Sequence, residues 1–202
     1  TGKIIVAGRW ADAIGTIIIS DDGGENWYAS SQTIPFDNRL LRMQMVNGSV
    51  GYFGGEYGYF AKTTDGAMSL TQIVMPFDPL NFYYNMEFFD QSTGWVVGGI
   101  PTPILTPLVA KTTDGGLNWN SVQSGVTDEL FSVAFSGSNG ICGGGSQTIL
   151  YSTNMGTSWN IFQTGFFGGG FFGAAMLSPQ IGFVAGQNSI FQKKKKKTTD
   201  SG

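Results

Sequence analysis

A short pattern that recurs about every 45 residues constrains the fold of this chain more than any other feature. Its third copy is KTTDGGLNW, at residues 111–119, and the copies begin at the hydroxyl residues Ser20, Thr63, Thr112, Ser152 and Thr198. Self-similarity at a period of roughly 20–50 residues is typical of stacked repeats, because one such unit cannot bury its apolar face alone. We therefore expect an array of similar units.

Each complete unit contains four short apolar segments and shows no helical spacing. A run bracketed by glycine, such as Gly94–Gly98 or Gly182–Gly186, precedes the motif, and a further apolar run precedes that one. Four strands in about 45 residues are what a β-propeller blade requires, whereas a β-sandwich needs about 100 residues per unit. The sequence therefore predicts an all-β fold, a β-propeller of four-stranded antiparallel blades joined by tight turns.

The repeat divides the chain into a partial blade at 1–34, blades at about 35–78, 79–127 and 128–165, and a partial blade at 166–202. The first unit lacks its leading strand, and the last ends within the motif. The N-terminal strands could join the C-terminal strand in one composite blade, which would close a ring of four or five blades. We favour the other interpretation, in which the chain is part of a larger propeller.

Composition supports short strands and excludes several kinds of site. Gly reaches 31 of 202 residues and charged residues only 12%, which suits strands joined by tight turns. The chain has no His, which excludes His-based catalysis and His metal ligands. Cys142 is the only cysteine, so no intrachain disulfide can form, and no apolar run is long enough to span a membrane. We expect no metal and no cofactor.

The positive charge is concentrated in one place. Five of the 11 basic residues form the run Lys193–Lys197, which leaves six against 14 acidic residues elsewhere. A broad basic surface for nucleic acid is therefore not expected. The run itself is interpreted as a solvated bulge or as an insert that binds polyanions. Peptide mass spectrometry across it would show whether the insert is genuine.

The repeated motif follows the pattern Ser/Thr-x-Asp-x-Gly-x-x-Trp. Its Asp can accept backbone hydrogen bonds in a tight turn, its Gly permits a positive φ, and its Trp is expected to bury its ring between blades. Asn154 replaces the Asp in one copy and Leu70 replaces the Trp in another, which indicates a structural rather than a catalytic motif. The structural residues are Ser20, Asp22, Gly24, Trp27, Thr63, Asp65, Thr112, Asp114, Gly116, Trp119, Ser152, Asn154, Gly156, Trp159, Thr198 and Asp200.

The motif resembles the Asp-box, or BNR repeat, of sialidases, sortilin-type receptors, xyloglucanase-type glycosidases and photosystem II stability and assembly factors. GWVVGG (94–99) followed by KTTDGGLNW, and GFVAG (182–186) followed by KTTDSG, are most similar to the assembly factors. This resemblance implies a non-enzymatic binding and assembly scaffold with a protein partner, in a plastid or the thylakoid lumen. The chain has only three Arg residues, so a basic docking face is not expected.

Two other functions stay open. The chain could be a secreted or cell-surface glycoprotein with a structural or carbohydrate-binding role, and Asn47-Gly48-Ser49 would then be a glycosylation site, although Asn-Gly is also a common hairpin turn. A glycosidase is the least favoured alternative. Sialidases would need an arginine triad from separate blades, whereas Arg39 and Arg42 lie in one unit. Other glycosidases need two facing carboxylates.

Candidate binding residues lie in the loops that lead from one blade to the next. Asp37, Asp78 and Asp128 occupy equivalent positions there, and could form a ring that binds a sugar, a cation or a basic partner, or could simply hold turns. The stretch GFFGGGFFG (165–173) could present four aromatic rings to a protein partner, unless two of them turn inward. Those rings are Phe166, Phe167, Phe171 and Phe172, and Phe82, Tyr83 and Tyr84 are expected on the same face.

Overall fold

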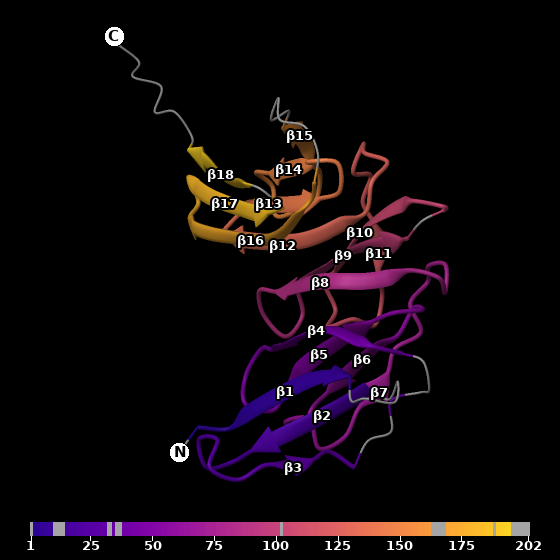
Figure 1. Ribbon diagram of the computed structural model, residues 1–202, viewed down its shortest axis with the longest axis vertical. Helices are drawn as coiled ribbons and strands as arrows, with labels where there is room; N and C mark the ends of the chain where they lie inside the picture. The colour runs from indigo at the N-terminus through magenta and orange to yellow at the C-terminus, as the bar shows by residue number, and fades with distance from the viewer. Residues whose placement is uncertain are drawn as a thin grey trace.

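The computed structural model describes residues 2–9, 15–31, 34, 38–101, 103–162, 169–187 and 189–194. Within these ranges every regular element is a β-strand, and the strands form five antiparallel sheets (Figure 1). The prediction of an all-β array of four-stranded antiparallel units is confirmed. In the described part of the chain, no helix has the length and apolar character needed to cross a membrane.

The sheets follow the order of the chain, and neighbouring strands in each sheet are consecutive in sequence. The first and last sheets have three strands and the middle three have four. The strands are β1 (Ile4–Arg9), β2 (Gly15–Ser20) and β3 (Tyr28–Ala29); β4 (Leu40–Met45), β5 (Gly51–Gly55), β6 (Phe60–Thr63) and β7 (Thr71–Gln72); β8 (Phe82–Phe88), β9 (Gly94–Ile100), β10 (Thr106–Thr112) and β11 (Asn120–Ser121); β12 (Leu130–Ser136), β13 (Asn139–Gly144), β14 (Ile149–Ser152) and β15 (Asn160–Phe162); and β16 (Phe171–Ser178), β17 (Ile181–Gly186) and β18 (Ser189–Lys194).

Successive sheets are stacked side by side along the long axis of the molecule, from the first sheet, with β1–β3, at one end to the fifth, with β16–β18, at the other (Figure 1). The first strands β4, β8, β12 and β16 lie side by side in this order. The short fourth strands β7, β11 and β15 form the opposite edge of each sheet. Each begins at the residue that follows the motif's last position. This is the radial order of propeller blades, with the first strands innermost.

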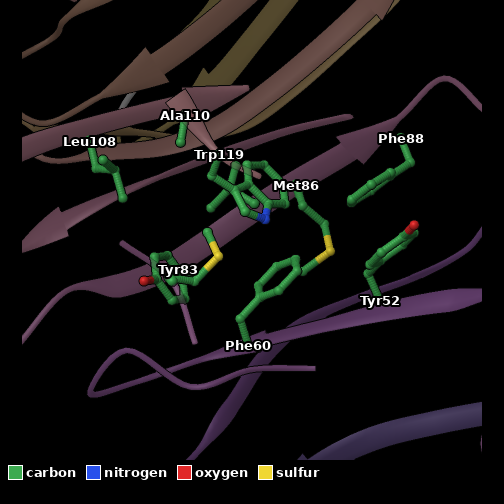
Figure 2. Close-up of a cluster of buried hydrophobic side chains, with 10 residues drawn as sticks. Tyr52, Phe60, Tyr83, Met86, Phe88, Leu108, Ala110 and Trp119 are labelled. Carbon is green, nitrogen blue, oxygen red and sulfur yellow. The ribbon is translucent and has the colours of Figure 1, made fainter. Parts of the chain in front are cut away.

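The hydrophobic core lies between the sheets rather than within any of them. One cluster joins Tyr52 and Phe60 of the second sheet to Phe88 and Trp119 of the third (Figure 2). Similar clusters join the first sheet to the second, the third to the fourth and the fourth to the fifth. All residues of β9 are buried, because this strand has a sheet on each face. Each sheet therefore depends on its neighbours for burial.

The glycines that bracket each second strand make room for the first strand. A Cβ on Gly94 would clash with the ring of Phe88, and a Cβ on Gly98 would clash with the backbone oxygen of Phe82. Gly140 stands in the same relation to Phe135. The bracketed runs seen in the sequence are thus a packing requirement of the blade.

The lysine run is only partly described. Lys193 and Lys194 lie in β18, where they pair with Gly182 and Ile181 of β17 without a register shift. The expectation of a bulge is therefore wrong for these two residues, because the ladder with β17 continues through them. Residues 195–197 lie outside the described ranges.

Candidate functional site

The topology separates the loops into two rims. The turns between third and fourth strands, which are the repeated motif, lie at one end of the sheets and form the Asp-box rim (residues 20–27, 63–70, 112–119 and 152–159). The connections to the next sheet and the hairpins between second and third strands lie at the other end. We call this end the connection rim (residues 56–59, 78–81, 125–129, 145–148 and 169–170). Consecutive antiparallel strands require this separation.

In the third sheet the Asp-box turn is closed by a set of short-range hydrogen bonds. The Thr112 hydroxyl donates to Asp114 Oδ1 (2.9 Å) and accepts from the backbone N–H of Gly116 (3.0 Å). Asn118 donates its backbone N–H to Asp114 Oδ1 (2.9 Å) and its side-chain amide to Oδ2 (2.7 Å). The Trp119 indole N–H donates to the oxygen of Gly116 (3.2 Å). Both carboxylate oxygens are thus occupied inside the turn.

The other described copies repeat the hydroxyl and backbone bonds of this turn with different residues, whereas the indole bond recurs only for Trp27 and the buried Trp159 indole nitrogen has no hydrogen-bond partner among the described residues. Their partners are Ser20, Asp22, Gly24 and Asn26 in the first sheet, Thr63, Asp65, Ala67 and Ser69 in the second, and Ser152, Asn154, Gly156 and Ser158 in the fourth. Ala67 takes the positive φ (70°) that glycine adopts in the other three copies. The fifth copy, with Thr198 and Asp200, lies outside the described residues.

These hydrogen bonds determine the protonation of the motif carboxylates. Donation from the backbone and then the side chain of Asn118 lowers the pKa of Asp114 to about 2. The side chain and then the backbone of Ser69 lower the pKa of Asp65 to about 2, and the pKa of Asp22 is lowered still further, chiefly by Asn26. A carboxylate held ionised in this way is unsuited to proton transfer near neutral pH. The geometry supports the structural role predicted for the motif.

The Trp residues of the motif do not all share one environment. Trp119 and Trp159 are 6% and 8% exposed, whereas Trp27 is 43% exposed. The expectation of a buried ring is therefore wrong for Trp27. Trp119 packs edge-to-face on Phe60 of the preceding sheet, and no described sheet precedes the one that carries Trp27. Leu70, in the Trp position of the second copy, is partly buried against the first sheet's core cluster.

The sequon is part of a hairpin turn on the Asp-box rim. Asn47 is exposed, and its side-chain oxygen accepts hydrogen bonds from the backbone N–H groups of Ser49 and Val50, both at 2.8 Å. These bonds support the turn interpretation of Asn47. Glycosylation of its amide nitrogen stays a prediction.

The candidate acids on the connection rim are engaged with their neighbours. Asp78 Oδ1 accepts from the backbone N–H of Leu80 (2.8 Å), and Asp128 Oδ1 accepts from the Ser146 hydroxyl (3.0 Å). Asp37 lies outside the described residues. For Asp78, the contacts support a role in the turn. Within the described ranges, no group of three His, Cys, Asp or Glu side chains could hold a metal ion.

Two further acids on this rim were not singled out from the sequence. Glu129 accepts a hydrogen bond from the Tyr84 hydroxyl (2.6 Å), and Glu56 pairs with the Nε of Arg39 (3.3 Å). Glu129 follows the candidate Asp128 directly, which could have indicated it. No sequence pattern pointed to Glu56.

Five aromatic side chains form a continuous row on the connection rim and along the first strands. The ring centroids of Tyr57 and Phe82 are 5.1 Å apart, those of Phe82 and Tyr84 5.9 Å, those of Tyr84 and Phe131 5.1 Å, and those of Phe131 and Phe172 4.9 Å. We call Tyr57, Phe82, Tyr84, Phe131 and Phe172 the aromatic row. The row spans four sheets, from the β5–β6 hairpin of the second to β16 of the fifth, and Tyr57 and Phe172 are 51% and 55% exposed.

The structure brings only some of the predicted aromatic residues to this surface. Phe172 is exposed but Phe171 is 1% exposed, and Tyr83, expected on the surface, is completely buried. Strand alternation sends these two side chains into the core. Phe166 and Phe167 lie outside the described residues. Phe131 and Tyr57 were missed because single aromatic residues give no distinctive sequence signal.

Two hollows lie on the described surface of the fourth and fifth sheets. One, of about 290 Å³, lies between the fourth and fifth sheets and is lined by Ile141 and Tyr151. In the second sheet the equivalent residues, Tyr52 and Lys62, donate to the backbone oxygen of Gly115 in the next Asp-box turn. We therefore assign this hollow to blade packing. The other, of about 270 Å³, lies beside Asp128 on the connection rim.

The model of the family described as photosynthesis system II assembly factor YCF48 matches residues 62–166, just over half of the chain. The chain belongs to this family. No curated protein matches its sequence.

Solved structures show that the fold of this YCF48-family chain is part of a β-propeller. YCF48 from Cyanidioschyzon merolae superimposes with a TM-score of 0.69 at 16% identity, covering 93% of this chain and 65% of that one. A GH74 enzyme from Niastella koreensis gives 0.71 at 16% identity, covering 93% and 35%. The WD40 β-propeller domain of Doa1 gives 0.69 at 7% identity, covering 96% and 61%. The chain thus spans between about a third and two thirds of these structures, and the propeller prediction is confirmed.

Proposed function

We propose that this YCF48-family chain is a non-enzymatic scaffold that assists photosystem II assembly by binding a protein partner at the connection rim. The observation that carries the proposal is the aromatic row, which leaves Tyr57 and Phe172 about half exposed on a rim whose sequence differs between repeats. Aromatic side chains are typical anchors of protein interfaces. The Asp-box rim, by contrast, uses its polar groups within its own turns.

The contacts of the acidic residues support a binding role over a catalytic one. A glycosidase needs two carboxylates about 5–10 Å apart that face the scissile bond, one of them free to donate a proton. On the described part of the connection rim, Asp78, Asp128, Glu129 and Glu56 each already contact a neighbouring donor or cation. Their arrangement therefore stabilises the rim rather than presenting a catalytic pair.

The family description also supports a location in the plastid, in the thylakoid lumen, where a photosystem II assembly factor would meet its partner. A secreted or cell-surface role, structural or carbohydrate-binding, is the alternative, with a glycan attached at Asn47 as its marker. Cell fractionation with an antibody against the chain distinguishes the two. Recovery with thylakoids supports the proposal, and recovery from the culture medium in a glycosylated form contradicts it.

A direct test is to isolate a tagged form of the chain from thylakoids and identify the photosystem II subunits that accompany it. We expect subunits of assembly intermediates in excess over those of the mature complex, and slower photosystem II assembly in a strain without the protein. Normal assembly in that strain would contradict the proposal. Release of sugar from xyloglucan by the purified chain, lost in Asp128→Asn, would contradict the non-enzymatic part.

A further inference from the structure

We propose that the aromatic row is a binding track for an extended, positively charged peptide segment. Three of its five residues, Tyr84, Phe131 and Phe172, stand at a β-bulge that recurs in the described first strands. The proposal rests on the proposed function in one respect, that the partner is a protein. It adds the chemistry of the segment that is bound, the residues that bind it, and the structural device that places those residues.

The bulge occurs at the same point of four consecutive sheets. The ladder between first and second strands skips one residue in each, between Leu40 and Arg42, Tyr83 and Asn85, Leu130 and Ser132, and Phe171 and Gly173. The residues skipped are Leu41, Tyr84, Phe131 and Phe172. All four are large and apolar or aromatic. Recurring bulges of this kind re-aim side chains and are often found beside functional sites.

At each bulge two consecutive bulky side chains point in different directions, as in any strand. The residues before the skipped ones, Leu40, Tyr83, Leu130 and Phe171, are at most 7% exposed and belong to the core between sheets. The skipped residues are partly or largely exposed, and Phe172 reaches 55%. The bulge leaves each of these accessible residues without a partner in the ladder.

Glycines on the second strands hold this geometry in place. A Cβ on the glycine opposite each bulge would clash with a backbone oxygen two residues before the skipped residue. These pairs are Gly55 with Arg39, Gly98 with Phe82, Gly144 with Glu129 and Gly186 with Gly170. Because this close approach of glycine to backbone oxygen recurs in four sheets, the bulge is a regular feature of the blade rather than a local irregularity.

The charge of the connection rim indicates a cationic partner. The described charged residues of the rim are the acids Glu56, Asp78, Asp128 and Glu129. Two bases lie beside it, Arg39, which pairs with Glu56, and Arg42 on β4, which is near Glu87. The lysine side chains whose contacts are described lie on the Asp-box rim. Lys3 is near Asp21, and Lys62 and Lys111 each donate a hydrogen bond to a backbone oxygen of the Asp-box turn in the next sheet. An Arg or Lys side chain approaching the connection rim therefore meets net negative charge and open aromatic rings, which attract cations.

The ring geometry favours a peptide over a sugar as the occupant. A sugar ring stacks flat on one open aromatic face. Here three of the four ring contacts are edge-on or tilted, Tyr57 with Phe82 at 75°, Phe82 with Tyr84 at 59° and Tyr84 with Phe131 at 69°, and Phe131 with Phe172 is stacked, at 29°. The row therefore presents ring edges as well as ring faces. An extended chain, whose alternate side chains point to one side, fits it.

The test is isothermal titration calorimetry of the 202-residue chain with a synthetic peptide of alternating Arg and Val. Peptides in which Glu or Ser replaces Arg are the controls for charge. We expect the Arg peptide to bind, to bind more weakly as salt is added, and to lose about 3- to 30-fold in affinity in Phe172→Ala. Leu177→Ala is the matched control, because Leu177 lies on the same strand and is 73% exposed but is not in the row. The affinity of Leu177→Ala for the Arg peptide should be unchanged.

A second variant separates charge from structure. Glu129→Gln keeps an acceptor for the Tyr84 hydroxyl but removes a negative charge. We expect about a 2- to 5-fold loss of affinity for the Arg peptide and a shallower dependence on salt. An unchanged salt dependence, equal binding of the Glu peptide, or unchanged affinity in Phe172→Ala would each overturn the proposal. Binding of a xyloglucan oligosaccharide that is lost in Phe172→Ala would also overturn it, in favour of a carbohydrate site.

The same variants distinguish a failure of this inference from a failure of the proposed function. In one outcome, photosystem II intermediates accompany both the unaltered chain and Phe172→Ala, and the Arg peptide does not displace them. The scaffold function then stands and the binding track is wrong. If the Arg peptide binds at the row but no photosystem II subunit accompanies the chain, the track stands and the proposed function is wrong.

Discussion

Trp119 in the third sheet and Trp27 in the first end turns that are closed by the same hydrogen bonds. In both, the indole N–H donates to the backbone oxygen of the motif glycine, at 3.2 Å and 2.9 Å. Yet Trp119 is 6% exposed and Trp27 is 43% exposed. Trp119 packs on Phe60 of the sheet before it, whereas no described sheet lies before the one with Trp27.

The comparison shows that the motif does two separable things. Its hydroxyl, Asp and backbone N–H groups close a turn through contacts that span at most four residues, in every described copy. Its Trp contributes to the core only where a neighbouring sheet supplies the other wall. The turn is therefore a local property, and the burial is a property of the array.

The largest effect that tests this difference is expected for Trp119→Ala. Removal of a buried aromatic ring should lower the free energy of unfolding by about 3–5 kcal/mol. The same change at Trp27 should cost about 1 kcal/mol or less, because 43% of this residue is already exposed to water. Urea unfolding of both variants measures the difference. Equal losses would show that the sheets do not bury Trp119 as described.

A smaller effect is expected from adding a methyl group to the motif glycine. Gly24 and Gly156 both have a positive φ, but a Cβ on Gly156 would clash with the buried indole of Trp95 in the preceding sheet, and a Cβ on Gly24 would meet only ordinary contacts. Gly156→Ala should therefore destabilise the chain by about 1–3 kcal/mol more than Gly24→Ala. Thermal melting of the two variants is the measurement. A greater loss in Gly24→Ala would contradict the comparison.

The smallest effect concerns the turns themselves, which should behave alike in both sheets. The pKa values of Asp22 and Asp114 are lowered in the folded chain, so both carboxylates stabilise it above the ordinary Asp pKa of about 4. This stabilisation should be lost as the pH falls from about 4 towards about 2. Asp22→Asn and Asp114→Asn should each make stability less dependent on pH in that range, as measured by urea unfolding at a series of pH values.

The pH dependence of stability could change greatly in Asp114→Asn but not in Asp22→Asn. That result would show that the turn also depends on burial. Asn154 supports the choice of Asn, because it already makes the backbone and hydroxyl contacts of the motif in the fourth sheet.

Much of the fold could be predicted from the sequence because its signals are periodic. The glycine-bracketed runs, the apolar segments before them and the repeated motif together indicate four strands per unit, and the sheets have this order. The turn bonds of Asp65 and Asp114 could also be anticipated, since their partners lie within four residues.

The candidate site was predicted less well. The aromatic stretch pointed to Phe172, but the burial of Phe171 and Tyr83 and the contribution of Phe131 depend on where each first strand bulges. A signal for the bulge does exist in retrospect. Each first strand carries two consecutive bulky residues, LL, YY, LF or FF, at this point.

The sequence by itself determined the period, the antiparallel four-strand unit and the Asp-box turn, because hydrogen bonds between near neighbours and apolar spacing are local properties of the chain. The tertiary structure decided which Trp is buried, which of two adjacent rings faces the core, and that five aromatic residues from four repeats meet in one row. Those outcomes depend on how one sheet packs against the next, and no segment of the sequence contains both partners of such a contact.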